Sequence, residues 1–265
     1  MAGAGIEAQL QLSIAIVFER RGTVFLLLGM LAWVCIGLVG AFLVAAALGS
    51  GALLLHHLPG FGFVPEPSLL LYVLAGSTGF QLTLLWGALR QGRRLGNGDQ
   101  RAGLGITRIR HVGQVALLCV VMIVCLLSFV LLAAHFPALR EFAKSVTPDI
   151  MARLSEGGPL GVLAKVSLAV VLAPLSEELF FRGWLWEALR QRGHAFASTA
   201  CITALPWLLL HGLDSPARIV FLIPAALVFS FARHVGRSVL ASLVVHVANN
   251  TAAVMLQAVA VLVGE

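Results

Sequence analysis

Long apolar runs alternate with short polar connections along almost the whole chain. A membrane-spanning helix needs roughly 20 consecutive, mostly apolar residues, and most of these runs are that long. The pattern predicts an all-α fold, a polytopic transmembrane helical bundle of seven to eight spans. The runs cover residues 23–48, 69–89, 112–134, 160–188, 197–211, 218–232 and 238–262.

The fifth and sixth runs are short for complete spans, and Gly212, Asp214 and Pro216 separate them. They could form tilted, incomplete or broken helices, which membranes tolerate where the backbone lines a protein cavity. An eighth span hidden in residues 49–68 or 135–160 would place the two termini on the same side. No internal repeat or low-complexity linker is visible, so we expect one integrated membrane domain.

Composition excludes a soluble domain of this size. Apolar residues make up 59% of the 265 positions and charged residues only 11%, far less charged surface than a soluble protein needs. All four cysteines lie inside apolar runs without CxxC spacing, and we interpret them as small hydrophobic residues rather than disulfide or metal ligands. The first run is longer than the roughly 7–15 residues of a signal-peptide core, which favours a retained span. The cysteines are Cys35, Cys119, Cys125 and Cys201.

The placement of basic residues predicts the orientation. Positively charged loops stay in the cytoplasm, and twelve of the 18 basic residues fall in connections on the N-terminal side. The N-terminus should therefore be cytoplasmic, and the net charge of +6 needs no nucleic-acid partner. The twelve are Arg20, Arg21, Arg90, Arg93, Arg94, Arg101, Arg108, Arg110, Arg190, Arg192, Arg233 and Arg237; Arg140, Lys144, Arg153 and Arg218 lie opposite, and Lys165 and Arg182 lie within the fourth run.

Two adjacent carboxylates in the fourth run, Glu177 and Glu178, are the most informative feature of the sequence. A charged side chain at the bilayer centre costs about 2.5–3.5 kcal/mol on insertion scales. Glu178 and Arg182 are four residues apart, so they can pair on one helical face. Glu177 points about 100° away and has no local counter-charge. Removing it from water favours its protonated form, which suits a general base near neutral pH. Alternatively, all three form a structural ion cluster.

Polar residues in two further runs could join Glu177. His211 ends the fifth run, while His246 and Asn250 share a helical face in the seventh. Glu177 and His211 each lie 17 residues from His194, in the turn between their helices, so regular helices would place them at similar depth. A lone histidine in an apolar helix more often makes a packing hydrogen bond. Together, an acid, two imidazoles and an amide could activate water and stabilise an oxyanion.

These motifs resemble those of the CPBP family, which comprises CAAX proteases and bacteriocin-processing proteins and is often called Abi. Residues 160–255 carry the resemblance, and the first 159 residues match only as generic spans. One departure is a tryptophan where the family usually has phenylalanine. The motifs are Glu-Glu-x-x-x-Arg at Glu177, Glu178 and Arg182, aromatic-x-x-x-His at Trp207 and His211, and His-x-x-x-Asn at His246 and Asn250.

The resemblance implies an intramembrane endopeptidase whose catalytic core is residues 160–265, preceded by N-terminal spans and a basic loop in residues 1–159. It implies a peptide or membrane-protein substrate in the lipid bilayer, which we expect to be the bacterial inner membrane. The implied roles are a water-activating base, Glu177, assisted by His211; oxyanion stabilisers, His246 and Asn250; a brace, Glu178 with Arg182; and aromatic packing by Trp207.

The cofactor and two competing functions stay open at this point. The sequence lacks HExxH, although Glu177, His211 and His246 could supply a His₂Glu set for zinc. Metal-free chemistry uses the same residues and is the preferred interpretation, although the family is often labelled as metalloproteases. A non-catalytic membrane immunity or interaction protein could keep the same fold. A proton-coupled transporter also buries Glu and His, but no inverted repeat supports it.

Overall fold

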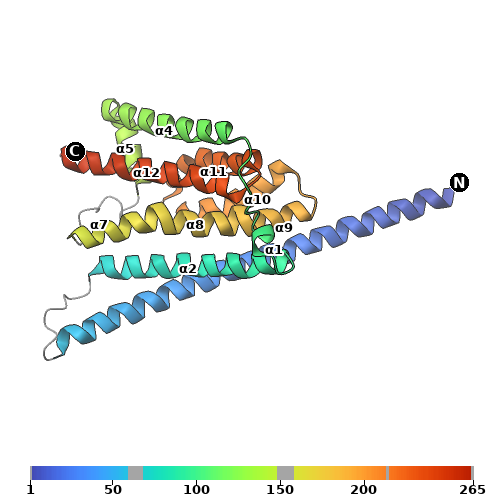
Figure 1. Ribbon diagram of the computed structural model, residues 1–265, viewed down its shortest axis with the longest axis horizontal. Helices are drawn as coiled ribbons and strands as arrows, with labels where there is room; N and C mark the ends of the chain where they lie inside the picture. The colour runs from blue at the N-terminus through green and yellow to red at the C-terminus, as the bar shows by residue number, and fades with distance from the viewer. Residues whose placement is uncertain (1, 59–67, 148–157, 213–214, 264–265) are drawn as a thin grey trace.

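The chain folds into a helical bundle (Figure 1). The computed structural model describes residues 2–58, 68–147, 158–212 and 215–263, and these ranges contain helices and turns but no strand. The helices are α1 (Ala2–His57), α2 (Leu69–Leu95), α3 (Gln100–Gly103), α4 (Val112–His135), α5 (Pro137–Val146), α7 (Gly158–Ser167), η1 (Leu168–Leu172), α8 (Ala173–Glu177), η2 (Glu178–Leu185), α9 (Trp186–Gln191), α10 (Phe196–Gly212), α11 (Pro216–Gly236) and α12 (Val239–Val263).

Each of the seven apolar runs forms a helix, which confirms the predicted membrane bundle. Six helices in the described part of the chain are long and apolar enough to cross a membrane. The 17-residue α10 is shorter, whereas the sixth run forms a full-length helix of 21 residues. In the two stretches proposed for an eighth span, the described helical residues belong to the end of α1, the end of α4, the ten-residue α5 and the start of α7.

The outer surface of the bundle is strongly apolar. Phe25 and Phe42 are each 72% exposed and Leu160 is 80% exposed. Such extensive exposed apolar surface is unfavourable in water but expected against lipid. All four cysteines are free, and Cys35, Cys125 and Cys201 lie exposed among these side chains, in agreement with their interpretation as small hydrophobic residues.

Helix α1 is longer than the first predicted span. Its apolar part, Gly22–His57, has 36 residues, and the N-terminal end of α1 projects away from the other helices (Figure 1). Small residues let α1 and α2 approach closely, because Gly37 lies against Phe80 and Gly49 against Tyr72. Glycines of this kind are typical of helix interfaces in membranes.

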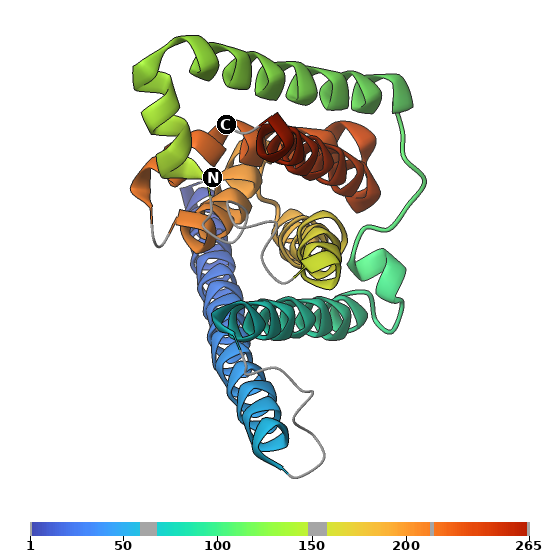
Figure 2. The same ribbon diagram turned by 90° about the vertical axis from the view of Figure 1, so that its left-hand side faces the viewer.

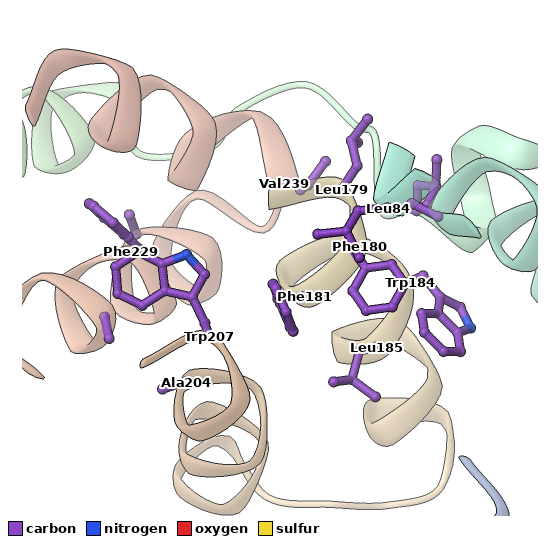
Figure 3. Packing of buried hydrophobic residues seen from close by; sticks show 14 of the residues in the cluster. Leu84, Leu179, Phe180, Phe181, Trp184, Leu185, Ala204, Trp207, Phe229 and Val239 are labelled. Atoms are coloured by element: carbon purple, nitrogen blue, oxygen red, sulfur yellow. The ribbon is translucent and has the colours of Figure 1, made fainter. Parts of the chain in front are cut away.

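The helices from α7 to α9 form one continuous rod, residues 158–191, which we call the central helix. It lies between α2 and α12 (Figure 2). Two stretches, Leu168–Leu172 and Glu178–Leu185, are π-helical, a feature that often marks functional sites in helices. The second stretch carries Phe180, Phe181 and Leu185, which are fully buried. They form the core with side chains from α2, α10, α11 and α12 (Figure 3).

The loop after α3 binds the turn between α11 and α12. Gly105 has φ +61° and its carbonyl oxygen accepts a hydrogen bond from Val239 N at 3.1 Å. A Cβ at this position would collide with the ion pair of Arg233 and Glu187. Arg233, which the sequence pattern places in a polar connection, lies within α11 and is only 4% exposed. It therefore contributes to internal packing rather than to a charged loop.

Candidate active site

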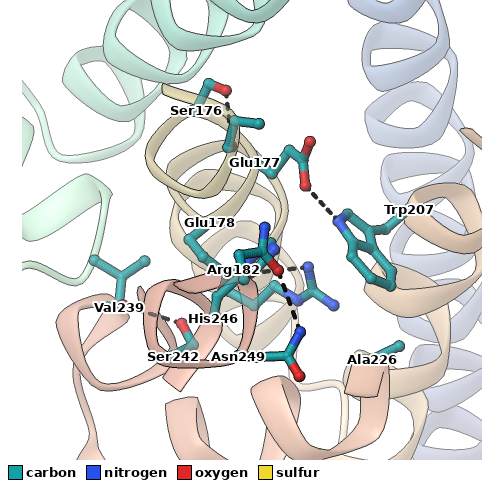
Figure 4. Close-up of polar contacts among 12 residues, drawn as sticks. Ser176, Glu177, Glu178, Arg182, Trp207, Ala226, Val239, Ser242, His246 and Asn249 are labelled. Atoms are coloured by element: carbon teal, nitrogen blue, oxygen red, sulfur yellow. Dashed lines mark hydrogen bonds and ion pairs between the residues drawn. The ribbon is translucent and has the colours of Figure 1, made fainter. Parts of the chain in front are cut away.

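Glu177 is the last residue of α8, immediately before the second π-helical stretch. Its carboxylate is held by two neutral donors from different helices. Gln81 Nε2, on α2, donates to Oε1 at 3.0 Å, and Trp207 Nε1, on α10, donates to Oε2 at 2.7 Å (Figure 4). Hydrogen bonds to a carboxylate offset the cost of removing it from water. The sequence predicted no local counter-charge for Glu177, and neutral N–H groups fill that role.

His211 reaches the same carboxylate from the end of α10. Its Nε2 lies 3.8 Å from Glu177 Oε2, and its side chain is 32% exposed, against 6% for Glu177. Its Nδ1 lies 2.9 Å from the carbonyl oxygen of Trp207. A carbonyl only accepts hydrogen bonds, so Nδ1 carries a proton, and in a neutral ring the lone pair of Nε2 is left for another partner. The expected similar depth of Glu177 and His211 is confirmed.

Glu178 has charged partners instead. It is fully buried, and its Oε1 accepts from Arg182 Nη1 at 3.2 Å and lies 2.9 Å from His246 Nδ1. The predicted pair of Glu178 and Arg182 is thus confirmed. The Arg182 guanidinium also lies 5.1 Å from the ring centroid of Trp207 and 5.7 Å from that of Phe229, distances typical of cation–π contacts. Pairing of this kind makes a buried charge tolerable.

His246 and Asn250, the two candidate site residues of α12, both contact the central helix, at different places. His246 stacks on Phe229, with ring centroids 4.3 Å apart, and its Nδ1 points to Glu178. Asn250 Nδ2 donates to the carbonyl oxygen of Ala169, in the first π-helical stretch, at 2.9 Å. The structure therefore pairs Glu177 with His211 and joins His246 to the predicted brace.

Trp207 contacts both the pair of Glu177 and His211 and the cluster of Glu178, Arg182 and His246. Its ring centroid lies 4.2 Å from that of His211 and 5.8 Å from that of His246. The sequence predicted only aromatic packing at this position, whereas the indole N–H also binds Glu177. A phenylalanine, the usual residue of the resembled family, has no such donor.

Sequence reasoning missed Gln81 and Ser176. Gln81 is 8% exposed in the middle of α2, and its amide oxygen accepts a hydrogen bond from the fully buried Ser176 hydroxyl. The signal was present, because a glutamine flanked by apolar residues at membrane depth needs a partner.

The geometry does not assemble the proposed zinc ligands. Among the described residues, no three His, Cys, Asp or Glu side chains are grouped so that they could hold a metal ion. The donor set in this part of the chain therefore does not fit a three-ligand metal site.

One comparison with known proteins found a match. Residues 159–252 match the family model described as type II CAAX prenyl endopeptidase, Rce1-like. No curated protein and no solved structure matches the chain. The matched region contains Glu177, Trp207, His211, His246 and Asn250 and excludes Gln81. Residues 159–252 are therefore similar to the Rce1-like CAAX prenyl endopeptidases, the group that the three sequence motifs resemble.

Proposed function

We propose that the chain is an intramembrane endopeptidase that hydrolyses a peptide bond of a membrane-associated protein or peptide. One observation carries the proposal: Glu177 Oε2 and His211 Nε2 lie 3.8 Å apart, and both are hydrogen-bond acceptors when His211 is neutral with its single proton on Nδ1. Two acceptors at this separation repel one another unless a donor lies between them. A water molecule donating one proton to each is the simplest such donor.

In the proposed reaction, this water is the nucleophile. Its two O–H bonds point to Glu177 and His211, so its lone pairs are free to attack the scissile carbonyl carbon. Glu177 takes up a proton as the C–O bond forms, and the carbonyl oxygen becomes an oxyanion. The proton then moves to the amide nitrogen, the C–N bond breaks, and the products are a carboxylic acid and an amine.

His246 and Asn250 are the proposed oxyanion stabilisers. Glu178 supports this role for His246, because a carboxylate on Nδ1 stabilises the imidazolium form, whose Nε2–H can donate. Asn250 uses one amide N–H on Ala169 and retains a second donor for substrate. Glu178 and Arg182 brace the site from the fully buried side of the central helix.

The proposed substrate is a protein or peptide presented from the bilayer, since the site lies among apolar helices with exposed hydrophobic surfaces. The direct test compares membranes of cells that produce the parent protein, Glu177→Gln or Glu141→Gln. Quantitative mapping of protein termini in these membranes reveals any shifted terminus. Glu141→Gln is the matched control, because it removes an exposed carboxylate of α5 by the same chemical change.

We expect termini that appear with the parent protein and with Glu141→Gln and disappear with Glu177→Gln. A farnesylated C-terminal peptide supplied to the purified proteins in lipid asks whether prenylated substrates are included. Identical termini with the parent protein and Glu177→Gln, at equal amounts of folded protein, would overturn the proposal. A cellular phenotype that persists in Glu177→Gln would instead favour the non-catalytic interaction protein.

A further inference from the structure

Gln81 binds the candidate base from a helix outside the Rce1-like region. We propose that Gln81 is a positioning residue of the hydrolysis, which holds the Glu177 carboxylate in the orientation that lets it share a water molecule with His211. This inference rests on the proposed function. It extends the catalytic unit from residues 159–252 to α2, in the N-terminal half of the chain.

The orientation of the Gln81 amide follows from its two partners. Its Nε2 lies 3.0 Å from Glu177 Oε1, and its Oε1 accepts the Ser176 hydroxyl proton. The flipped amide would place Oε1 against a carboxylate oxygen, and two acceptors at that distance repel. Glu177 and Ser176 are adjacent on the central helix, so one amide forms hydrogen bonds with both residues.

Packing fixes Gln81 relative to the central helix. Leu84 and Ala88, one and two turns further along α2, are fully buried in the common core. On the opposite side of α2, Gly79 lies against Val44 of α1. These contacts leave α2 little freedom to slide, so the amide nitrogen stays where Glu177 needs it.

Two donors from separate helices restrict the rotation of the carboxylate. Trp207 binds Oε2 and Gln81 binds Oε1, so turning the group would break both hydrogen bonds. Oε2 thereby keeps its 3.8 Å separation from His211 Nε2. With Trp207 alone, the carboxylate can rotate about one hydrogen bond and lose the alignment with the shared water. Misplacing a catalytic group by a fraction of an ångström lowers the rate more than it weakens binding.

The test variant is Gln81→Leu, which keeps the approximate size of the side chain and removes its amide. Purified protein in lipid vesicles is assayed on membranes that contain the Glu177-dependent substrates, at increasing membrane concentration. We expect the saturating rate to fall about 10–100-fold, the effect of one hydrogen bond to a charged group. The half-saturating amount should change less than about twofold, because the residue acts in the transition state.

A matched control and a double-mutant cycle separate positioning from stability. Gln91→Leu makes the same change on the same helix at a half-buried position and should leave rate and thermal unfolding unaltered. Ser176→Ala should slow the parent protein less than Gln81→Leu does. It should add almost nothing to Gln81→Leu, because Ser176 acts through the amide.

An infrared experiment tests the same role of Gln81 without any substrate. Subtracting the infrared spectrum of Glu177→Gln from that of the parent isolates the Glu177 carboxylate stretch, and the same subtraction is made in the Gln81→Leu background. We expect the band to shift in Gln81→Leu and to stay in place in Gln91→Leu. An unshifted band in Gln81→Leu would overturn the role of Gln81 but not the proposed function. A full rate in Gln81→Leu, while Glu177→Gln is inactive, would have the same meaning. Full activity of Glu177→Gln would overturn the proposed function itself.

Discussion

Glu177 and Glu178 are neighbours in the chain, yet their carboxylates face two different regions of the protein. Glu177 meets neutral donors and a histidine whose side chain is 32% exposed. Glu178 is fully buried and meets Arg182 and His246. Adjacent residues of a helix point about 100° apart, so one helix can present the same chemical group to both regions.

The comparison shows that the surroundings of two carboxylates, those of Glu177 and Glu178, suit them to different roles. Glu178 is the carboxylate partner of the buried Arg182 guanidinium, so its removal should disturb the fold. Neutral donors orient Glu177 without neutralising it, which leaves an oxygen able to accept a proton. The His211 side chain is 32% exposed, so the region around Glu177 is more accessible than the region around Glu178.

The largest expected effect comes from Glu178→Gln. This change leaves the Arg182 guanidinium buried without a carboxylate, which costs about 3–5 kcal/mol, a large part of the 5–15 kcal/mol that keeps a typical domain folded. We expect a low yield of folded protein and a clearly lowered Tm in detergent. A Tm equal to that of the parent would contradict the assignment of Glu178 as a structural brace.

Glu177→Gln should remove activity rather than structure. Loss of a general base costs about 10²–10⁴-fold in rate, and we expect cleavage near the lower limit of detection. The new amide NH₂ replaces one carboxylate oxygen and faces the N–H donor of Gln81 or Trp207. A modest fall in Tm should follow, smaller than for Glu178→Gln. A greater loss of stability than that of Glu178→Gln would reverse the comparison.

Trp207→Phe sharpens the role of the neutral donors. Phenylalanine keeps an aromatic ring near Arg182 and His211 but removes the indole N–H that binds Glu177. Because Gln81 still binds Oε1, we expect roughly a tenfold loss of rate, the low end for a hydrogen bond to a charged group. Cleavage kinetics on the Glu177-dependent substrates measure this loss. Activity equal to the parent would show that the indole donor is dispensable.

Glu141 supplies the exposed reference with the smallest expected effect. A hydrogen bond and ion pair with Lys144 hold the pKa of Glu141 below its usual value of 4.5. A lowered folded-state pKa adds stability above the unfolded value, and this stability is lost as pH falls through the folded value. Solvent screens the pair, so Glu141→Gln should leave Tm nearly unchanged at pH 7. Any small difference should vanish in melting curves recorded well below pH 4.5.

Hydropathy predicted the membrane helices because the backbone N–H and C=O groups of an apolar span in lipid must form hydrogen bonds within the span's own helix. The spacing of Glu178 and Arg182 predicted their pairing for a similarly local reason. Equal distances from the turn at His194 predicted that Glu177 and His211 lie at similar depth, which agrees with their 3.8 Å contact. These successes share one property: each depends on the geometry of one helix or one helical hairpin.

Contacts between distant helices were not predictable in this way. The rotation of α12 decides whether His246 faces Glu177 or Glu178, and the sequence of α12 alone does not fix that rotation. The π-helical stretch at Glu178–Leu185 also changes the angles that a regular helix would give. Gln81 is 96 residues from Glu177 in the chain, and only the packing of α2 on the central helix brings them together.

The short helix α10 has a consequence for the surrounding lipid. At 1.5 Å per residue its 17 residues span about 26 Å, less than the roughly 30 Å of a bilayer's hydrocarbon layer. A bilayer adjusts to this difference in length by thinning locally or by admitting water beside the short helix. His211 lies at one end of α10, so the proposed catalytic pair of Glu177 and His211 should lie under a depression of the membrane surface, where the proposed hydrolysis can draw on water that lipid excludes elsewhere.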